Sequence, residues 1–196
     1  FDKDGGVTLI TGTLDYGQGH ASPYAQVLSQ QLGVPFEKIR LVQGDSDVVH
    51  MGNGTGGSRS ITASGQAIVE ASALVIEKGK QAAAHVLEAS AADIEFSGGR
   101  FTIAGTDRGI NIMDLAQTLR DDPPKDGPDS LDVDHVSSDV QSTFPNGCHV
   151  AEVEVDPDTG TIEIVNYTGV NDFGVVVNPL MVAGQVHGGV AQGIGQ

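Results

Sequence analysis

Two glycine-rich segments, each between an expected strand and an expected helix, constrain this chain more than any other feature. The first is Gly17-Gln18-Gly19-His20, and the second runs from Gly52 to Ser60 with the sequence Gly-Asn-Gly-Thr-Gly-Gly-Ser-Arg-Ser. Glycine adopts positive φ angles at little cost and lets backbone N–H groups approach a ligand closely. A helix that starts directly after such a segment adds a partial positive charge at its N-terminus. The segments therefore predict two loops suited to a phosphate or another anionic oxygen, and Gln18 in the first could exchange hydrogen bonds with a heterocycle.

The hydrophobic pattern gives the order of the elements around these loops. It predicts strands at Val7–Thr13 and Ile39–Val42, and helices at Ser22–Leu32 and Thr62–Ala89. Further along it predicts a hairpin at 94–103 that turns at Gly98-Gly99, followed by a short helix at 112–119. It then predicts a half-exposed strand at 131–140 and a second hairpin at 148–155 and 161–168. The last predicted helix begins at Asn178-Pro179. This mixture predicts an α+β fold in which helices pack on mixed sheets.

We expect residues 1–196 to form one partial domain of a larger subunit, with residues 121–130 as an exposed loop. That loop carries Pro123-Pro124 and several aspartates. The chain opens at Phe1 without an initiator methionine and stops at Gln196 inside a helical segment, which suggests a piece of a longer polypeptide. Apolar side chains near that end, such as Val190 and Ile194, are then expected to be exposed or covered by a second copy of the chain.

The charge balance excludes several classes of partner. The chain has 10 lysines and arginines against 26 aspartates and glutamates, for a formal net charge of -16. Such a surface repels nucleic-acid phosphates and anionic membranes, so neither is an expected partner. The chain shows no signal peptide and no apolar run of spanning length. Its one cysteine, Cys148, cannot form an internal disulfide and is expected to be a small buried residue, which is compatible with the cytoplasm.

The glycine segments offer ligand chemistry without matching the common nucleotide motifs. The second segment combines backbone donors, hydroxyl groups and Arg59, but it is neither a Walker P-loop nor a Rossmann fingerprint. A third segment places Gln185 and His187 among small residues after Asn171-Asp172-Phe173-Gly174. Each segment alone also fits an ordinary role: a glycine turn with a polar cap, a flexible loop with a serine cap, or a close helix crossing. The six histidines show no metal-ligand spacing.

Taken in order, these segments resemble the molybdenum-cofactor-binding portion of the xanthine dehydrogenase/aldehyde oxidase family. The nearest resemblance is to the large subunit of bacterial aerobic carbon monoxide dehydrogenases. The resemblance covers nearly the whole chain. Besides the two glycine segments, it is carried by Tyr24-Ala25-Gln26, Leu32-Gly33-Val34-Pro35, Gly44-Asp45-Ser46, Asp156-Pro157-Asp158-Thr159-Gly160, Asn171-Asp172-Phe173-Gly174, Val177-Asn178-Pro179 and Gly184-Gln185-Val186-His187-Gly188-Gly189.

This resemblance implies a part of a molybdenum hydroxylase that oxidises an aldehyde or an N-heterocycle with oxygen from water. The implied cofactor is molybdopterin with molybdenum, in its cytosine dinucleotide form, and we expect none bound in this piece alone. The implied partners are the rest of the large subunit, iron–sulfur and FAD subunits or domains, and a small-molecule substrate. The residues implied to bind the cofactor are Gln18, Gly19, His20, Thr55, Gly56, Gly57, Ser58, Arg59 and Ser60, with Asp172, Gln185 and His187 as further candidates.

Two departures from the family pattern limit what the chain can do alone. The family's catalytic glutamate lies in a motif beyond the last match, so no catalytic residue is assigned here and the chain is expected to be inactive by itself. The substrate-side loop, which carries a cysteine in relatives of the carbon monoxide enzyme, is expected upstream of Phe1. In addition, Phe173 stands where carbon monoxide dehydrogenases carry a cysteine, so the resemblance does not identify the substrate and does not favour carbon monoxide. Two alternatives remain: a non-redox phosphate- or nucleotide-binding module, and a packing or assembly piece. Without a ligand, we expect Arg59 to face a carboxylate such as Asp45 or Asp172.

Overall fold

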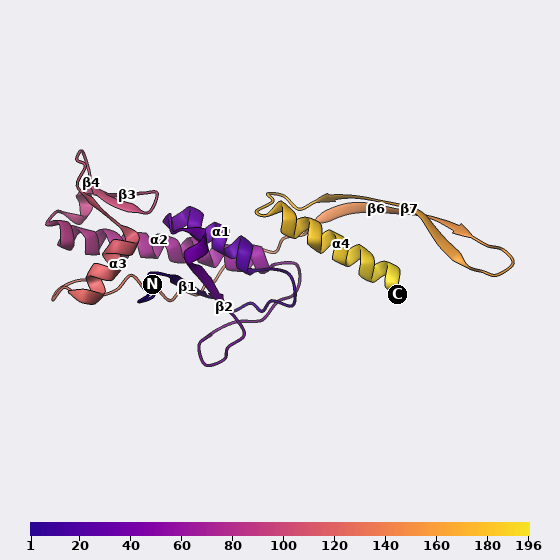
Figure 1. Cartoon of the computed structure of the whole chain (residues 1–196), viewed down its shortest axis with the longest axis horizontal. Coiled ribbons are helices and arrows are strands. Elements are labelled where there is room, and N and C mark those ends of the chain that lie inside the picture. Colours follow the sequence, from indigo (N-terminus) through magenta and orange to yellow (C-terminus); the bar gives the residue numbers. More distant parts are fainter. The chain divides into compact units, whose positions relative to one another are not determined.

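The computed structural model describes all residues from 1 to 196, and the chain divides into two compact units. The first unit combines Phe1–Gln141 with Val177–Gln196, and the second is Ser142–Val176. Helices and small sheets are mixed along the chain, so the predicted α+β class is confirmed (Figure 1).

Two short parallel strands open the first unit. Strand β1 (Val7–Ile10) pairs with β2 (Ile39–Val42), with Val7 opposite Ile39 and Ile10 opposite Val42. A parallel pair needs a crossover connection, and here it is helix α1 (Ala21–Leu32) followed by the 3-10 turn η1 (Phe36–Lys38). Gly33 ends α1 with a φ of 64°, and its N–H donates to the Ser29 carbonyl at 2.8 Å. The first strand is shorter than predicted because the chain turns into the first glycine loop after Ile10.

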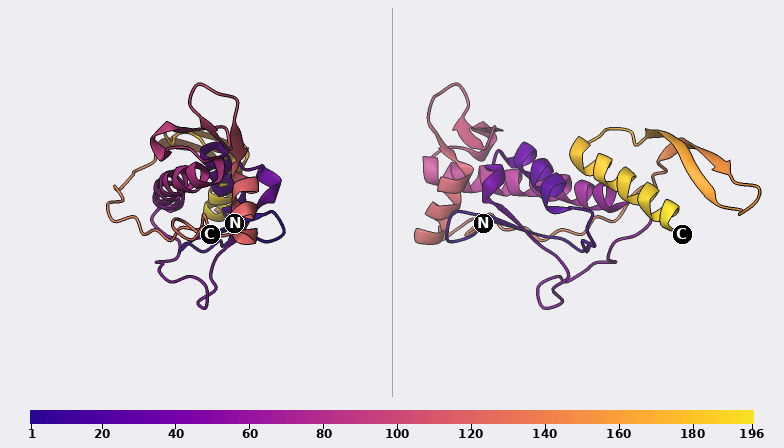
Figure 2. Two further views of the ribbon diagram at one scale, coloured as in Figure 1. Left: turned by 90° about the vertical axis from the view of Figure 1, so that its left-hand side faces the viewer. Right: turned by 45° about the vertical axis from the view of Figure 1, so that its right-hand side comes forward.

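Helix α2 (Ser60–Leu87) forms the centre of the core. It lies along α1 and also contacts the next sheet (Figure 2). Ile68, Val75 and Ala82 are buried, as the period of the sequence predicted. Gly79 must be glycine, because a Cβ there would overlap the ring of the fully buried Phe101.

A three-stranded antiparallel sheet follows α2. It consists of β3 (Ile94–Ser97), β4 (Arg100–Ile103) and β5 (Gly109–Asn111), in that order. The predicted hairpin is confirmed, since Gly98 and Gly99 have φ angles of 54° and 83°, as a primed turn requires. The sequence pattern missed β5. Helix α3 (Ile112–Asp121) then buries its apolar face, which consists of Ile112, Leu115, Ala116 and Leu119.

The predicted strand at 131–140 is wrong. No strand partner lies beside this segment, which is irregular and is fastened to α2 by side chains. Lys78 Nζ donates to the Asp132 carbonyl at 2.8 Å, and His135 Nε2 lies 2.7 Å from Glu70 Oε2. We call residues 131–141 the strap. Its apolar residues alternate because Leu131 and Val133 face the core while their neighbours face water.

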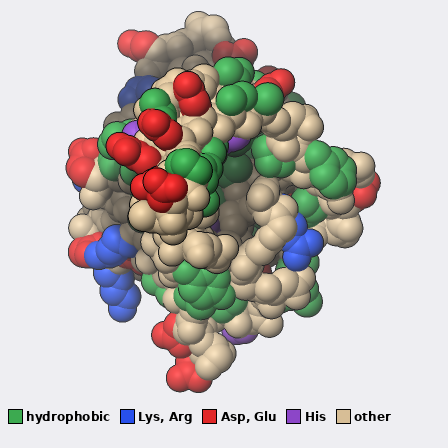
Figure 3. Space-filling model, turned by 90° about the vertical axis from the view of Figure 1, so that its right-hand side faces the viewer, with side chains coloured by type: hydrophobic (Ala, Val, Ile, Leu, Met, Phe, Trp, Pro, Cys, Tyr) green, Lys and Arg blue, Asp and Glu red, His purple; other side chains and the backbone are tan.

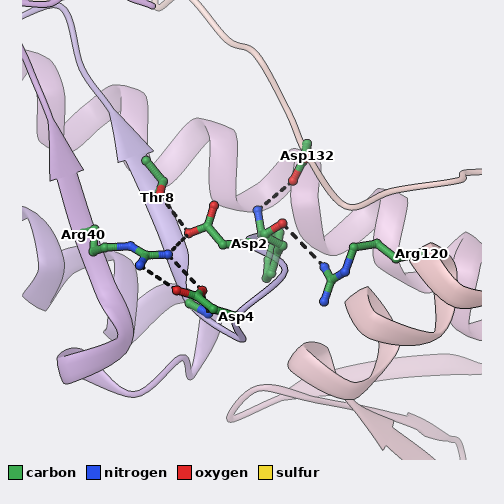
Figure 4. Close-up of polar contacts among 8 residues, drawn as sticks. Asp2, Asp4, Thr8, Arg40, Arg120 and Asp132 are labelled. Carbon is green, nitrogen blue, oxygen red and sulfur yellow. Dashed lines mark hydrogen bonds and ion pairs between the residues drawn. The ribbon is translucent and has the colours of Figure 1, made fainter.

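An ion-pair network holds the N-terminal turn against β2 (Figure 4). Arg40 places its guanidinium between Asp2 and Asp4, at 2.7 and 2.8 Å from their carboxylate oxygens. Hydrogen bonding from Arg40 lowers the pKa of Asp4 to about 2. A cleft of about 540 Å³ lies beside this turn and is lined by residues of η1 and α3 as well, including Lys38 and Arg120. None of its lining residues belongs to the glycine loops.

The second unit is a single hairpin. Strand β6 (Asn146–Val155) pairs antiparallel with β7 (Ile162–Asp172), with an irregularity in register at Glu152 and Val153. The predicted turn is confirmed: Asp156 Oδ1 accepts hydrogen bonds from the N–H groups of Asp158 and Thr159. Nearly every residue of the hairpin is exposed, including Cys148, so the expectation of a buried cysteine is wrong.

Helix α4 (Pro179–Gly195) begins as predicted. The Asn178 side chain accepts a hydrogen bond from the Met181 N–H at 3.0 Å, and Pro179 occupies the first turn. The helix has no buried residue, and Ile194 is 51% exposed. Hydrophobic and acidic side chains share the surface on the face shown in Figure 3. None of the helices combines the length and apolar character needed to cross a membrane.

Candidate cofactor site

The two glycine loops lie side by side because they leave the same ends of two paired parallel strands. The first loop, residues 11–20, runs from β1 to α1, and the second loop, residues 43–59, runs from β2 to α2. Ligands of parallel sheets commonly bind in crevices outside these carboxyl ends, where the following helices begin. Neither loop lies inside a regular strand.

Backbone contacts clamp the two loops together. The Gly54 N–H donates to the Gly12 carbonyl at 3.1 Å, and the Leu14 N–H donates to Thr55 Oγ1 at 3.1 Å. Gly12 and Gly52 approach so closely that a Cβ on either would overlap the backbone at the other. Thr55 therefore serves the connection between the loops.

A buried polar network lies beneath the clamp, and sequence reasoning missed it. Gln43 Nε2 donates to the hydroxyls of Thr11 and Thr13 at 2.8 and 2.7 Å. The Tyr24 hydroxyl donates to the Ser60 carbonyl at 3.1 Å, which ties α1 to the first residue of α2. Several of its members are polar residues that follow a strand or start a helix: Thr11, Thr13, Gln43, Ser60 and Ser64. Polar residues directly after a strand or at the start of a helix were the sequence signal that could have predicted this network.

The first loop is closed on itself by Asp15, which the sequence did not single out. Asp15 Oδ1 accepts hydrogen bonds from the N–H groups of Gly17 and Gly19 at 2.7 and 3.2 Å, and Oδ2 accepts from His20 at 2.7 Å. Partial burial alone would raise the pKa of Asp15, but the three N–H donors outweigh it and the pKa lies below its usual value. The expectation that these amides face a ligand therefore fails in this structure: an internal carboxylate holds them.

The three candidates of the first loop occupy different environments. Gln18 is half-buried, and its Oε1 accepts a hydrogen bond from the Tyr16 N–H. Gly19 packs on helix α4, since a Cβ there would lie 2.5 Å from Met181 Sδ. His20 is only 4% exposed and stacks on Tyr24 with ring centroids 5.1 Å apart. Gly19 has no side chain and that of His20 is buried, so Gln18 alone of the three has a side chain that is partly exposed.

The second loop, in contrast, stays open. A Cβ at Gly56 or Gly57 would meet nothing within 4 Å. Gly57 has a φ of 67°, and Ser58 adopts a φ of 53°, which is uncommon for a residue with a side chain. Backbone outliers of this kind gather at ligand-binding loops. The loop leads into the N-terminus of α2, where no side chain caps the helix.

Arg59 is exposed at the N-cap position of α2 and makes no ion pair within its unit. It is the only cation between Arg40 and Lys78. The expectation that Asp45 would take the ligand's place is wrong, because Asp45 instead accepts a hydrogen bond from the Asp47 N–H in its own turn. The guanidinium is therefore free to meet an anion.

The remaining candidates, Asp172, Gln185 and His187, lie outside the two glycine loops. Gln185 and His187 are exposed on α4, whose first turn reaches α1 through the 2.7 Å hydrogen bond from Asn178 Nδ2 to Gln26 Oε1. Asp172 ends β7 in the second unit, where it accepts a hydrogen bond from the Gly174 N–H. No group of three or more histidine, cysteine, aspartate or glutamate side chains could hold a metal ion.

The donor set at the second loop fits a diphosphate group. It combines open glycine backbone, the Ser58 hydroxyl, the free guanidinium of Arg59 and an uncapped N-terminus of a 28-residue helix. Backbone amides, hydroxyls and an arginine fork are the usual partners of phosphate oxygens. The first loop fits a different chemistry, because its ionised Asp15 repels anions while Gln18 offers an uncharged amide.

Comparison with known proteins places this geometry in a family. All residues, 1–196, match the family described as molybdopterin cofactor-binding domain. The chain is 34% identical to the carbon monoxide dehydrogenase large chain of Hydrogenophaga pseudoflava, over 93% of this chain and 23% of the relative. It is 35% identical to the nicotine 6-hydroxylase large subunit of Paenarthrobacter nicotinovorans, over 99% of this chain and 24% of that subunit.

Solved structures agree. The fold matches quinoline 2-oxidoreductase from Pseudomonas putida 86 with a TM-score of 0.82 and 31% identity, over 99% of this chain and 25% of that one. It matches a Cu,Mo-CO dehydrogenase with a TM-score of 0.82 and 32% identity, over 94% of this chain and 23% of that one. The chain thus spans about a quarter of the length of the curated relatives it matches. Both the sequence and the fold show that the chain belongs to the molybdopterin cofactor-binding domain family of the molybdenum-containing oxidoreductases.

Proposed function

We propose that this chain forms one wall of the molybdopterin site in the large subunit of a molybdenum hydroxylase, and that its second loop binds the diphosphate of a dinucleotide form of the cofactor. One observation carries the proposal: the second loop is open, carries an unpaired arginine and ends at an uncapped helix N-terminus. The contacts of Gly54 with Gly12 and of Thr55 with Leu14 hold that loop beside the first one.

The cofactor, once bound, supplies the redox chemistry, while the residues of the chain bind and orient it. Arg59 and the amides of the second loop would hold the diphosphate, which we infer to be that of the cytosine dinucleotide form. Gln18 would donate its amide to an uncharged edge of the ligand. His20, buried and stacked on Tyr24, would keep the first loop in position and not contact the ligand directly.

For the whole protein we propose the oxidation of an aldehyde or an N-heterocycle in the cytoplasm, with iron–sulfur and FAD subunits as electron carriers. The names of the relatives support this class of substrate. They include nicotine 6-hydroxylase, xanthine dehydrogenase and indole-3-acetaldehyde oxidase.

The test is the cofactor content of the intact large subunit carrying Arg59→Gln. Losing one charge-assisted contact costs about 1.5–3 kcal/mol, which corresponds to roughly 10- to 150-fold weaker cofactor binding. The measurement is molybdenum per subunit by elemental analysis, together with the nucleotide released on acid treatment. Lys80→Gln is the matched control, since it removes the same charge from an exposed ion pair with Glu77.

We expect low molybdenum and low nucleotide in Arg59→Gln and normal values in Lys80→Gln. Full occupancy in Arg59→Gln would contradict the role of the second loop. Nucleotide without molybdenum in the unmodified protein would favour the non-redox nucleotide-binding module, and the absence of both would leave the packing role.

A further inference from the structure

The two loops treat an approaching anion in opposite ways, although both precede a helix. In the first loop, just before α1, the N–H groups of Gly17, Gly19 and the N-cap residue His20 are already bound by the Asp15 carboxylate, at 2.7 to 3.2 Å. At the start of α2 no carboxylate reaches the backbone, and the first turn contains no acidic residue. The glycine content of the two loops does not reveal this difference.

The Asp15 carboxylate holds three backbone donors that an approaching phosphate would otherwise meet in the first loop. A helix N-terminus attracts anions through its free N–H groups and its partial positive charge. Asp15 adds a negative charge beside this N-terminus and occupies the N–H of the N-cap residue His20, together with the N–H groups of Gly17 and Gly19 in the loop before it. It is ionised at neutral pH, since the N–H donors prevail over the effect of burial and the pKa is lowered. A second anion at these three amides would meet repulsion and no free N–H group among them.

Gln18 completes the contrast. Its Oε1 accepts from the Tyr16 N–H, which fixes the side chain and leaves the two hydrogens of Nε2 without a partner. The first loop therefore presents an uncharged donor on a loop held by a partly buried carboxylate. Such a surface suits a carbonyl or a ring nitrogen and disfavours a phosphate.

We propose that Asp15 is an orientation-determining residue of the site: its carboxylate closes the first loop to phosphates, so that the anionic part of a dinucleotide ligand is directed to the second loop and its uncharged heterocyclic part to the first. This inference rests on the proposed function for the identity of the ligand, but the closure of the first loop to anions is a property of the chain itself. Asp15 acts through the backbone amides and is a positioning residue.

The test uses inorganic diphosphate as the probe and follows the backbone amides of the chain by NMR. In the unmodified chain, we expect saturable shifts only in the second loop, at Gly56, Gly57 and Ser58. In Asp15→Ala, we expect additional saturable shifts at Gly17, Gly19 and His20, because their N–H groups become free. Asp45→Ala is the matched control: it removes an aspartate that caps a turn in the second loop and should leave the first-loop amides unresponsive.

Asp15→Asn guards against loss of the loop structure. Asparagine keeps an acceptor oxygen but no charge, so it should hold the loop and still admit diphosphate more readily than aspartate does. If Asp15→Ala is unfolded, as judged by the dispersion of its amide spectrum, the asparagine variant decides. First-loop shifts in either folded variant support the proposal.

Two results would overturn it, and both can be told apart from a failure of the proposed function. First-loop shifts in the unmodified chain would show that Asp15 excludes nothing. The absence of new first-loop shifts in both variants would show that the Asp15 carboxylate is not what keeps diphosphate away from the first-loop amides. A silent second loop would instead count against the diphosphate role of Arg59, whatever the first loop does.

Discussion

Asp15 and Arg59 lie near the starts of α1 and α2 with opposite charges and opposite surroundings. Asp15 is bound by three backbone N–H groups, whereas Arg59 is exposed and makes no ion pair in its unit. Residue type alone would not have separated these roles. The aspartate is satisfied by its own loop, whereas the guanidinium of Arg59 is the group that we propose binds the diphosphate.

The close approach of Gly12 and Gly52 gives a prediction at the scale of single residues. Gly52→Ala places a Cβ into the backbone at Gly12, so the loops must separate. Overpacking of this kind costs about 1–3 kcal/mol. We expect a lower urea midpoint and, in the intact subunit, less bound cofactor.

Gly56→Ala is the matched control for that substitution. A Cβ at Gly56 meets nothing within 4 Å, and its φ is not in the left-handed region. The control should leave the free energy of unfolding unchanged or slightly raised, because alanine restricts the unfolded chain. Equal stability of the two variants would show that the contact between the loops carries no free energy.

At the scale of elements, the sequence predicted those features that depend on neighbouring residues. It failed where a feature depends on contacts between residues far apart in the chain. The Gly98-Gly99 turn and the Asn178-Pro179 helix start were predicted because each signal lies within a few residues. The strap was predicted as a strand because alternation says only that a segment is extended. Whether its partner is a strand or the side of α2 depends on Lys78 and Glu70, more than 50 residues away.

The same distinction applies to the site. The sequence located both loops, because glycine, polar residues and a following helix are adjacent in the chain. It did not reveal that Asp15 would engage the amides of the first loop, because that depends on the path of the backbone. Nor did it reveal the burial of His20, which follows from packing against Tyr24 and from the polar network.

The strap gives a prediction of pH dependence. Hydrogen bonds from Gln66 and His135 lower the pKa of Glu70 from 4.5 to about 2. A lowered folded-state pKa means that the stabilisation is present above the unfolded value of 4.5 and is lost as the pH falls towards 2. The stability gap between the unmodified chain and Glu70→Gln should therefore shrink as the pH falls from 5 to 3.

Urea unfolding at several pH values measures this gap, and hydrogen exchange of residues 131–141 shows whether the strap detaches. Glu77→Gln is a suitable control, because Glu77 pairs only with the exposed Lys80 on the same helix. A gap for Glu70→Gln that stays constant between pH 5 and 3 would rule out the contribution of this carboxylate.

At the scale of the whole molecule, the two units differ in how they bury apolar surface. The first unit has a continuous core, whereas the hairpin of the second exposes large side chains such as Val150, Ile162 and Val170. A two-stranded hairpin alone is marginally stable in water. The chain also spans about a quarter of the length of its relatives, so much of the surrounding protein in those enzymes has no counterpart here.

That coverage predicts that the 196-residue chain turns over no substrate by itself, even with cofactor added. One wall of a site can bind a ligand but cannot supply the positioning and proton transfer that each contribute orders of magnitude in rate. The assay combines the purified chain, molybdenum cofactor, an aldehyde or N-heterocycle and an artificial electron acceptor. Substrate-dependent reduction above a protein-free control would contradict the expectation.

The most direct test of the central claim is the molybdenum and nucleotide content of the intact large subunit, measured on the same purified sample. If the loops form a molybdopterin dinucleotide site, molybdenum and a released nucleotide should be present in equal amounts, close to one of each per subunit. A folded subunit that carries neither, when it is purified from cells that make the cofactor, would contradict the account.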